Sequence, residues 1–349
     1  MKLKSSLTLA AVAACSIFVL LPEANAQKAA EAKKGSFEKI KVHGKSLEGN
    51  LEGDSPDRDV FVYLPPSYAS SRNRRYPVVY FLHGYAAKAE TYWDMLAVPA
   101  AADAAMTDGS SREMILVFPD AHTIYDGSMF SNSLTTGDWE SFIAGDLVAY
   151  MDRHYRTIAN RDSRGLAGHS MGGYGTVRIG MKRPDAFSAL YAMSSCCLMN
   201  NPQQLLPPRP GRQAAPNAGT PKDGGALANA LSAQAAAWAP DPQNPPQYFD
   251  LPTKDGEVQP LIAAKWVTNS PLVMVDQYVP SLKRYRAIGL EVGNQDPFVT
   301  TNTQLDQSLT RLGIQHKFET YDGDHGNRIK ARFAEKLLPF FSANLSAAK

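Results

Sequence analysis

The chain has 349 residues, of which 44% are hydrophobic and 20% are charged, and its formal net charge is +2. This is the composition of a folded globular protein, and it excludes a disordered, collagen-like or disulfide-dense chain. A charge so close to zero gives no global attraction to nucleic acids, so we expect no nucleic-acid partner.

The first 26 residues have the three parts of a secretory signal peptide. Early lysines precede the apolar stretch 7–21, and Ala24-Asn25-Ala26 offers small residues for cleavage. We therefore expect residues 1–26 to be removed and the chain to be exported, periplasmic or secreted, with no stable membrane insertion afterwards. A lipoprotein cleavage box at Cys15 fits less well, because the apolar stretch continues past it.

Strand and helix patterns alternate after a polar spacer over residues 27–36. Short apolar runs predict strands over residues 37–42, 60–64, 78–82, 114–118, 165–167, 189–193, 288–292 and 317–321. Helical spacing predicts helices over residues 139–155 (capped by Asp138), 171–182, 300–312 and 328–345. This alternation predicts an α/β fold, with a mostly parallel central sheet, helices on both faces and the first two strands antiparallel at one edge.

One stretch interrupts this alternation, at about residues 200–265. Residues 202–260 hold half of the 24 prolines, and an Ala-rich helix is predicted inside them at Ala226–Trp238. A long insertion in a compact domain is often an active-site cover, so we expect a lid or cap; a disordered surface insertion is the alternative. Because the alternation then resumes, residues 37–345 are predicted to form a single domain.

The motif Gly168-His-Ser170-Met-Gly172 is the strongest chemical signal. A predicted strand precedes it and a predicted helix follows it, as a nucleophile elbow requires. Its glycines allow a tight turn that raises the serine hydroxyl above the strand ends. The pattern predicts that Ser170 is the nucleophile of an acyl-transfer reaction.

A serine hydroxyl needs a general base, and the base must follow the serine and its orienting acid in this kind of fold. His325 lies in the loop Asp322-Gly-Asp-His-Gly, between the last predicted strand and the last predicted helix, where the base belongs. His316 begins a strand pattern and is expected to be structural. We therefore predict His325 as the base.

The orienting acid should follow the penultimate strand. Asp296 lies there, in a loop directly before a proline, and is the predicted acid. Glu291 lies inside the strand and is a weaker rival. Asp322 and Asp324 are too near His325 in the sequence to align easily with its ring.

Two backbone N–H groups should stabilise the oxyanion. The first is expected from Met171, which follows the nucleophile, and the second from Tyr85, where Gly84 lets the backbone turn inward. His83 is expected to be a structural hydrogen-bonding residue.

No cofactor is expected. The chain has no dinucleotide fingerprint and no phosphate-binding loop, and no paired zinc spacing occurs. Four histidines lack the paired spacing that zinc ligands usually have: His43, His83, His122 and His154.

Large aromatic residues suggest a binding surface for an aromatic or sugar ester. The candidate substrate contacts are Trp93, Trp139 and Trp238, and the expected partner is a small-molecule or carbohydrate-linked ester. The adjacent Cys196 and Cys197 could be two buried free thiols or a vicinal disulfide.

The motif blocks of this chain resemble those of the esterase D-like, or "putative esterase", group of α/β hydrolases. This group contains S-formylglutathione hydrolases, feruloyl and acetylxylan esterases, siderophore esterases and mycolyltransferases. The blocks are Val79-Tyr-Phe-Leu-His-Gly84, Gly137-Asp-Trp-Glu140, Tyr155-Arg-Thr157, Arg164-Gly-Leu-Ala-Gly-His-Ser-Met-Gly-Gly-Tyr-Gly175 and Gly323-Asp-His-Gly326.

The resemblance covers about residues 37–345 and implies an α/β-hydrolase fold with metal-independent serine chemistry. By position, the group's nucleophile, acid and base fall on Ser170, Asp296 and His325, and its oxyanion amides fall on Tyr85 and Met171.

The expected function is therefore that of an exported serine carboxylic-ester hydrolase. An acyltransferase that passes the acyl group to an alcohol, and a non-catalytic binding protein on the same scaffold, are the alternatives. The sequence does not indicate an oligomeric state.

Overall fold

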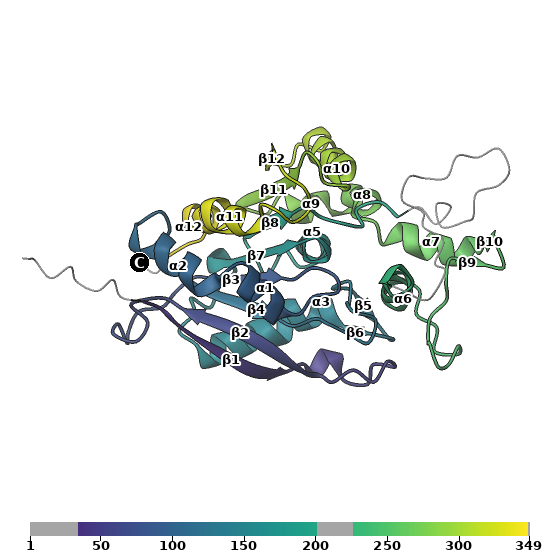
Figure 1. Cartoon of the computed structure of the whole chain (residues 1–349), viewed down its shortest axis with the longest axis horizontal. Helices are drawn as coiled ribbons and strands as arrows, with labels where there is room; N and C mark the ends of the chain where they lie inside the picture. Colours follow the sequence, from purple (N-terminus) through teal and green to yellow (C-terminus); the bar gives the residue numbers. More distant parts are fainter. Residues whose placement is uncertain (1–33, 201–225, 348–349) are drawn as a thin grey trace, which may run out of the picture. The chain divides into compact units, whose positions relative to one another are not determined.

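The computed structural model describes residues 34–200 and 226–347 (Figure 1). These residues belong to one compact unit, Lys33–Lys349. The expected signal peptide, most of the spacer and residues 201–225 of the insertion lie outside the described residues.

An eight-stranded sheet forms the centre of this unit, in the order β1-β2-β4-β3-β7-β8-β11-β12. β1 pairs antiparallel with β2, β2 pairs antiparallel with β4, and all further pairs are parallel. The predicted mostly parallel sheet with an antiparallel edge is therefore confirmed. The strands are β1 (Ser36–His43), β2 (Asp57–Leu64), β3 (Val78–Leu82), β4 (Ile115–Pro119), β7 (Arg164–His169), β8 (Ala189–Met193), β11 (Ala287–Gly293) and β12 (Lys317–Tyr321).

Alternate residues of the central strands enter two separate apolar cores, because successive side chains of a strand point to opposite faces. Tyr80 and Leu82 of β3 join one core, whereas Val79 and Phe81 join the other. The first core is covered by α4 (Leu147–His154), α5 (Met171–Lys182) and α10 (Val299–Arg311). The second is covered by α1 (Ala89–Met95), α2 (Val98–Thr107) and α12 (Leu338–Asn344), so helices cover both faces.

Two of the predicted long helices are interrupted by wider turns. The helix predicted over residues 139–155 consists of α3 (Trp139–Ser141), a π-helical segment over Phe142–Asp146, and α4. A second π-helical segment, Phe333–Leu337, joins α11 (Ile329–Arg332) to α12. Asp138 precedes α3, but its side chain makes no capping hydrogen bond, so that prediction was wrong in detail.

The described part of the insertion contains two helices and a short hairpin, and its first helix contacts the rest of the domain. They are α6 (Ala226–Trp238), a hairpin of β9 (Thr253–Lys254) with β10 (Glu257–Val258), and α7 (Pro260–Thr268). Ser133 Oγ donates to the carbonyl of Ala236 in α6 over 2.6 Å, and the Trp238 ring lies 5.3 Å from that of Trp266 in α7. The other described elements are short: the helices α8 (Pro271–Met274) and α9 (Val279–Leu282), the pair β5 (Asn132–Ser133) and β6 (Gly137–Asp138), and 3-10 helices over Lys45–Leu47, Arg161–Ser163 and Val275–Tyr278.

Candidate active site

Ser170 lies at a sharp turn between β7 and α5. Its backbone φ is +58°, in the left-handed region that side chains disfavour, so the turn is strained. The motif glycines make the turn possible: a Cβ at Gly168 would lie 2.3 Å from the carbonyl oxygen of Gly172, and one at Gly172 would lie 2.0 Å from that of Leu82. The turn therefore brings the serine to the carboxyl end of the sheet, beside the first turn of a helix.

His325 and Asp296 meet this serine in one hydrogen-bonded chain. The Oγ of Ser170 lies 2.9 Å from Nε2 of His325, and Nδ1 of His325 lies 2.8 Å from Oδ2 of Asp296. Asp296 follows β11 and His325 follows β12, so neighbouring parallel strands deliver both side chains to the same edge of the sheet. The carboxylate accepts from Nδ1–H, which leaves Nε2 free to accept the serine proton.

Burial and hydrogen bonding act in opposite directions on the Asp296 carboxyl. Burial raises its pKa, but hydrogen bonds from the His325 ring and from the Phe298 N–H, at 2.8 Å, outweigh it and hold the pKa below its usual range. Asp296 is 2% exposed, whereas one third of the His325 side chain is open to solvent. Asp296 is therefore a fixed buried charge, whereas the side chain of His325 remains partly open to solvent.

The rival carboxylates and histidine of the sequence analysis have other partners. Glu291 is fully buried and pairs with Arg332 at 2.6 Å and with the hydroxyl of Tyr191. His316 pairs with Asp306 at 2.9 Å. These contacts direct both candidates to structural pairs instead of to the serine.

Asp322 and Asp324 likewise have hydrogen-bond partners other than the ring of His325. Asp322 accepts from the amide of Gln295, and Asp324 accepts from the backbone N–H groups of Gly326 and Asn327 at 2.8 Å. Asp324 therefore shapes the loop that carries His325.

The side chains of Tyr85 and Met171 both lie close to Gly127. A Cβ at Gly127 would lie 2.7 Å from the sulfur of Met171 and 2.9 Å from Cδ2 of Tyr85. Met171 is the first residue of α5, whose N–H has no partner inside the helix. Gly84 lies near Ser170, since a Cβ there would lie 3.4 Å from Cβ of Ser170.

Two residues linked to His325 were not identified from the sequence. The hydroxyl of Tyr92 lies 2.6 Å from Nδ1 of His169, and Nε2 of His169 lies 2.8 Å from the carbonyl oxygen of His325. Burial lowers the pKa of His169 to about 3, so its ring is neutral and its Nε2–H donates to that carbonyl. His169 stands beside Ser170 in the motif, which was the available signal; Tyr92, in α1, gave none.

His83 is held in place by the backbone on both sides of its ring. Its Nδ1 lies 2.8 Å from the carbonyl of Gly84, and its Nε2 accepts from the N–H of Ala121 at 2.8 Å. The ring therefore joins the loop after β3 to the loop after β4.

The three candidate tryptophans are buried in the apolar cores. Trp93 is 4% exposed and packs against Phe61 and Phe118. These three residues belong to the second core, on the face of the sheet that α5 does not cover. Trp139 is 1% exposed and Trp238 is 3% exposed. Among the described residues, none of the three indole rings makes a ring contact or a hydrogen bond with the Ser170 side chain.

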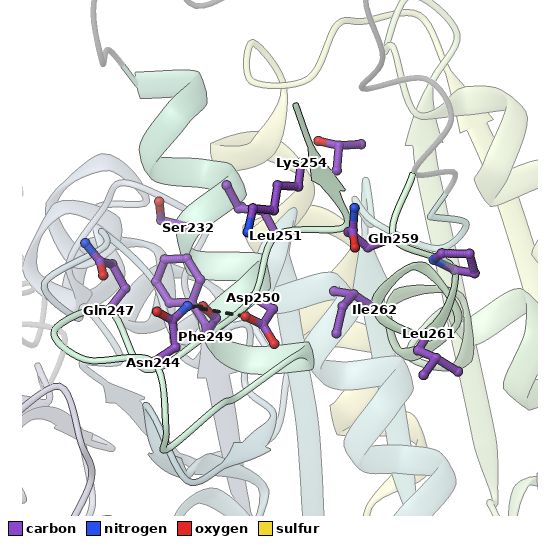
Figure 2. A pocket seen from close by; sticks show the side chains of 12 residues that line it. Ser232, Asn244, Gln247, Phe249, Asp250, Leu251, Lys254, Gln259, Leu261 and Ile262 are labelled. Atoms are coloured by element: carbon purple, nitrogen blue, oxygen red, sulfur yellow. Dashed lines mark hydrogen bonds between the residues drawn. The ribbon is translucent and has the colours of Figure 1, made fainter. Parts of the chain in front are cut away.

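A cavity of about 770 Å³ lies within the insertion (Figure 2). Figure 2 shows Asn244, Gln247 and Asp250 on one side and Gln259 and Ile262 on the other. Its described lining mixes amide, carboxylate and apolar groups, and it includes no member of the Ser170–His325–Asp296 chain.

Residues 34–200 and 226–347 contain neither a metal cluster nor a membrane-spanning helix. Within these ranges, no group of three or more His, Cys, Asp or Glu side chains is arranged to hold a metal ion. No helix in them combines the length and the apolar character that crossing a bilayer requires.

Both the family model and the curated relatives that match this chain are described as esterases. The model of the family described as "Putative esterase" matches residues 55–341. An esterase of Mycobacterium tuberculosis strain H37Rv is 32% identical over 125 residues, which cover 35% of this chain and 26% of the relative. An endo-1,4-beta-xylanase/feruloyl esterase of Xylanibacter ruminicola is 29% identical over 154 residues, which cover 42% of this chain and 20% of the relative. The matches therefore span about a quarter or less of these relatives.

Solved structures share the fold over most of the chain. A ferulic acid esterase has a TM-score of 0.64 at 21% identity, with 90% of this chain and 99% of the other covered. An S-formylglutathione hydrolase from Agrobacterium tumefaciens has a TM-score of 0.60 at 15% identity, with 90% and 97% covered. These likenesses identify the architecture as the α/β-hydrolase fold.

Proposed function

The chain belongs to the esterase family whose model matches residues 55–341, and we propose from this premise that it is an exported serine carboxylic-ester hydrolase. The observation that carries the proposal is the continuous chain from Ser170 Oγ through His325 to Asp296, with contacts of 2.9 Å and 2.8 Å. Residues 37–345 form its single catalytic domain, and residues 1–26 direct its export.

Acylation begins when Nε2 of His325 takes the hydroxyl proton of Ser170. The serine oxygen attacks the ester carbonyl, and the backbone N–H groups of Tyr85 and Met171 stabilise the oxyanion that develops. Asp296 stays ionised and stabilises the imidazolium through Nδ1–H. His325 then returns its proton to the leaving alcohol, which departs and leaves an acyl-Ser170 enzyme.

Water completes the reaction by the same steps in reverse order. His325 takes a proton from water, the resulting hydroxide adds to the acyl carbonyl, and Ser170 leaves with the proton that His325 returns. The partial exposure of the His325 side chain, at one third, supports this step, since the reaction needs water beside the imidazole.

The proposed substrate is an aromatic or carbohydrate-linked ester. The support is the similarity to a ferulic acid esterase and to a xylanase with a feruloyl esterase activity in its name. We propose that the insertion at about 200–265 acts as the cap over the acyl or alcohol group. Asn229 of α6 supports this position, because its amide donates to Asp126 over 3.1 Å and Ala86 donates to the Asp126 carbonyl over 3.0 Å, next to Tyr85.

The test combines turnover with labelling of the nucleophile. The purified mature chain should hydrolyse p-nitrophenyl acetate and methyl ferulate, and a fluorophosphonate should label Ser170. Ser170→Ala should abolish both signals, whereas Ser70→Ala, at an exposed serine, should change neither. Hydrolysis that survives in Ser170→Ala would refute the assigned nucleophile, and a dominant transfer product with added alcohol would make the chain an acyltransferase.

A further inference from the structure

The loop after β8 brings a sulfur atom next to the nucleophile. The backbone N–H of Cys196 donates to the carbonyl oxygen of Ser170 over 3.2 Å, and the two side chains lie within hydrogen-bonding reach of each other. Cys196 is 6% exposed. Cys196 thus contacts the proposed nucleophile directly, although the reaction steps above give it no role.

Cys197 adds a second sulfur, on a residue that is partly exposed. The two cysteines are free, their Sγ atoms lie 2.7 Å apart, and Cys197 is partly exposed where Cys196 is buried. The amide of Gln234 in α6 lies 3.8 Å from Cys197 Sγ. The two cysteines therefore lie between α6 of the insertion, which Cys197 contacts, and Ser170, which Cys196 contacts.

We propose that Cys196 and Cys197 form a thiol–disulfide modification site that controls the reactivity of Ser170, with a small-molecule disulfide as co-reactant. The thiol of Cys197 attacks one sulfur of the reagent disulfide and releases a first thiol. Cys196 then attacks Sγ of Cys197 and releases a second. Two protein thiols are oxidised to one vicinal disulfide, one reagent disulfide is reduced to two thiols, and each protein proton leaves on a released thiol.

Adjacency makes the closed form easy to reopen. The Cα atoms of neighbouring residues are about 3.8 Å apart across a trans peptide, below the roughly 4.4–6.8 Å of ordinary disulfides. Strained and accessible disulfides are the labile, regulatory ones. A vicinal disulfide here is therefore suited to reversible control and unsuited to holding the fold together.

Closing the ring acts directly on the nucleophile. It removes the S–H of Cys196 and shifts the backbone N–H that donates to the Ser170 carbonyl. Ser170 already occupies a strained turn, and a displacement of about 1 Å at a reacting group can lower the rate about 100-fold. We expect the closed form to have a kcat about 10-fold to 100-fold below that of the dithiol form.

The experiment measures the modification and its effect separately. The full chain is incubated with 2-hydroxyethyl disulfide, the reagent is removed, and the sample is divided for peptide mass mapping, esterase assay and fluorophosphonate labelling. We expect a loss of about 2 Da in the peptide with both cysteines, the corresponding loss of two hydrogens, together with slower hydrolysis and slower labelling of Ser170. A phosphine reductant should restore all three.

Cys197→Ser provides the matched control, because it keeps the thiol beside Ser170 and cannot close the ring. Its activity should not respond to the disulfide. The proposal is overturned if the cysteine peptide keeps both hydrogens or stays as a mixed disulfide, and equally if the ring closes without slowing hydrolysis or labelling. Peptide mapping separates this pair from Cys15, and mapping and labelling remain readable even if no ester is turned over.

Discussion

The ring of His169 holds the backbone of His325: its Nε2–H donates to the His325 carbonyl over 2.8 Å, and the two rings are 4.7 Å apart. The hydroxyl of Tyr92 fixes the other ring nitrogen of His169 at 2.6 Å. The residue before the proposed nucleophile thus positions the loop of the proposed base. Because burial keeps His169 neutral, this support adds no second positive charge beside the imidazolium.

Replacing His169 should impair the positioning of the base more than it impairs substrate binding. In His169→Phe the carbonyl of His325 loses its donor, so we expect kcat to fall about 10-fold to 100-fold with little change in KM. His169→Gln keeps an N–H donor at a similar reach and should recover part of the loss. Steady-state kinetics of both variants check this; equal losses in both, matched by equal losses of stability, would indicate a purely structural role.

Asp296→Asn should leave the fold intact and remove most of the activity. The amide keeps the size of the side chain but cannot hold Nδ1–H of His325 in the same way, so kcat should fall on the order of 1,000-fold to 10,000-fold. Because the pKa of Asp296 is held below its usual range, the carboxylate is ionised at neutral pH and the deficit should persist from about pH 6 to pH 9. A deficit that disappears within this range would contradict the assigned role.

Gly127→Ala probes the proposed oxyanion hole, whose amides cannot be removed by ordinary substitution. The new methyl group would lie 2.7 Å from Met171 and 2.9 Å from Tyr85, so it must displace one of them. We expect kcat to fall about 10-fold or more, as when one oxyanion donor is misplaced. Gly145→Ala is the control, since a Cβ there meets nothing within 4 Å; equal activity of the two variants would argue against this hole.

The inner strands of the central sheet could be predicted from the sequence because they are short, apolar and buried on both faces. β3 and β8 have the predicted bounds, since a strand that enters both cores permits few polar positions. β12 also has the predicted bounds, although it is an edge strand whose residues are exposed or half-buried. The helices α1 and α2 were not predicted, because their few buried residues leave the helical period weak. Local patterns of this kind also cannot reveal a π-helical turn inside a continuous apolar period.

The proposed triad could be identified because chain order limits the choices for acid and base in this fold. Contacts between residues far apart in the chain could not be predicted from the sequence in this way. The hydrogen bond from Tyr92 to His169 joins residues 77 positions apart, and nothing in the local sequence of α1 marks it. The sequence could not show that the three candidate tryptophans are buried in the apolar cores. Large aromatic side chains are common both in cores and in binding surfaces, so their presence alone does not distinguish the two.

Glu52→Gln should stabilise the protein at alkaline pH. Burial first, and then the neighbouring Asp54, raise the pKa of Glu52 to about 9. The folded chain therefore holds this proton more tightly than the unfolded chain does, and the free energy of unfolding falls as the pH rises from about 4.5 to about 9. Glutamine cannot ionise and avoids this loss, so the variant should be more stable at pH 8 on the order of 1 to 3 kcal/mol.

Denaturant unfolding at several pH values measures this difference. The advantage of Glu52→Gln should vanish near pH 4, where glutamate is largely protonated in both states. Glu335→Gln, at an exposed position, gives the background effect of the same substitution. An advantage that is equal at pH 4 and pH 8 would show that packing, and not the retained proton, sets the stability of this position.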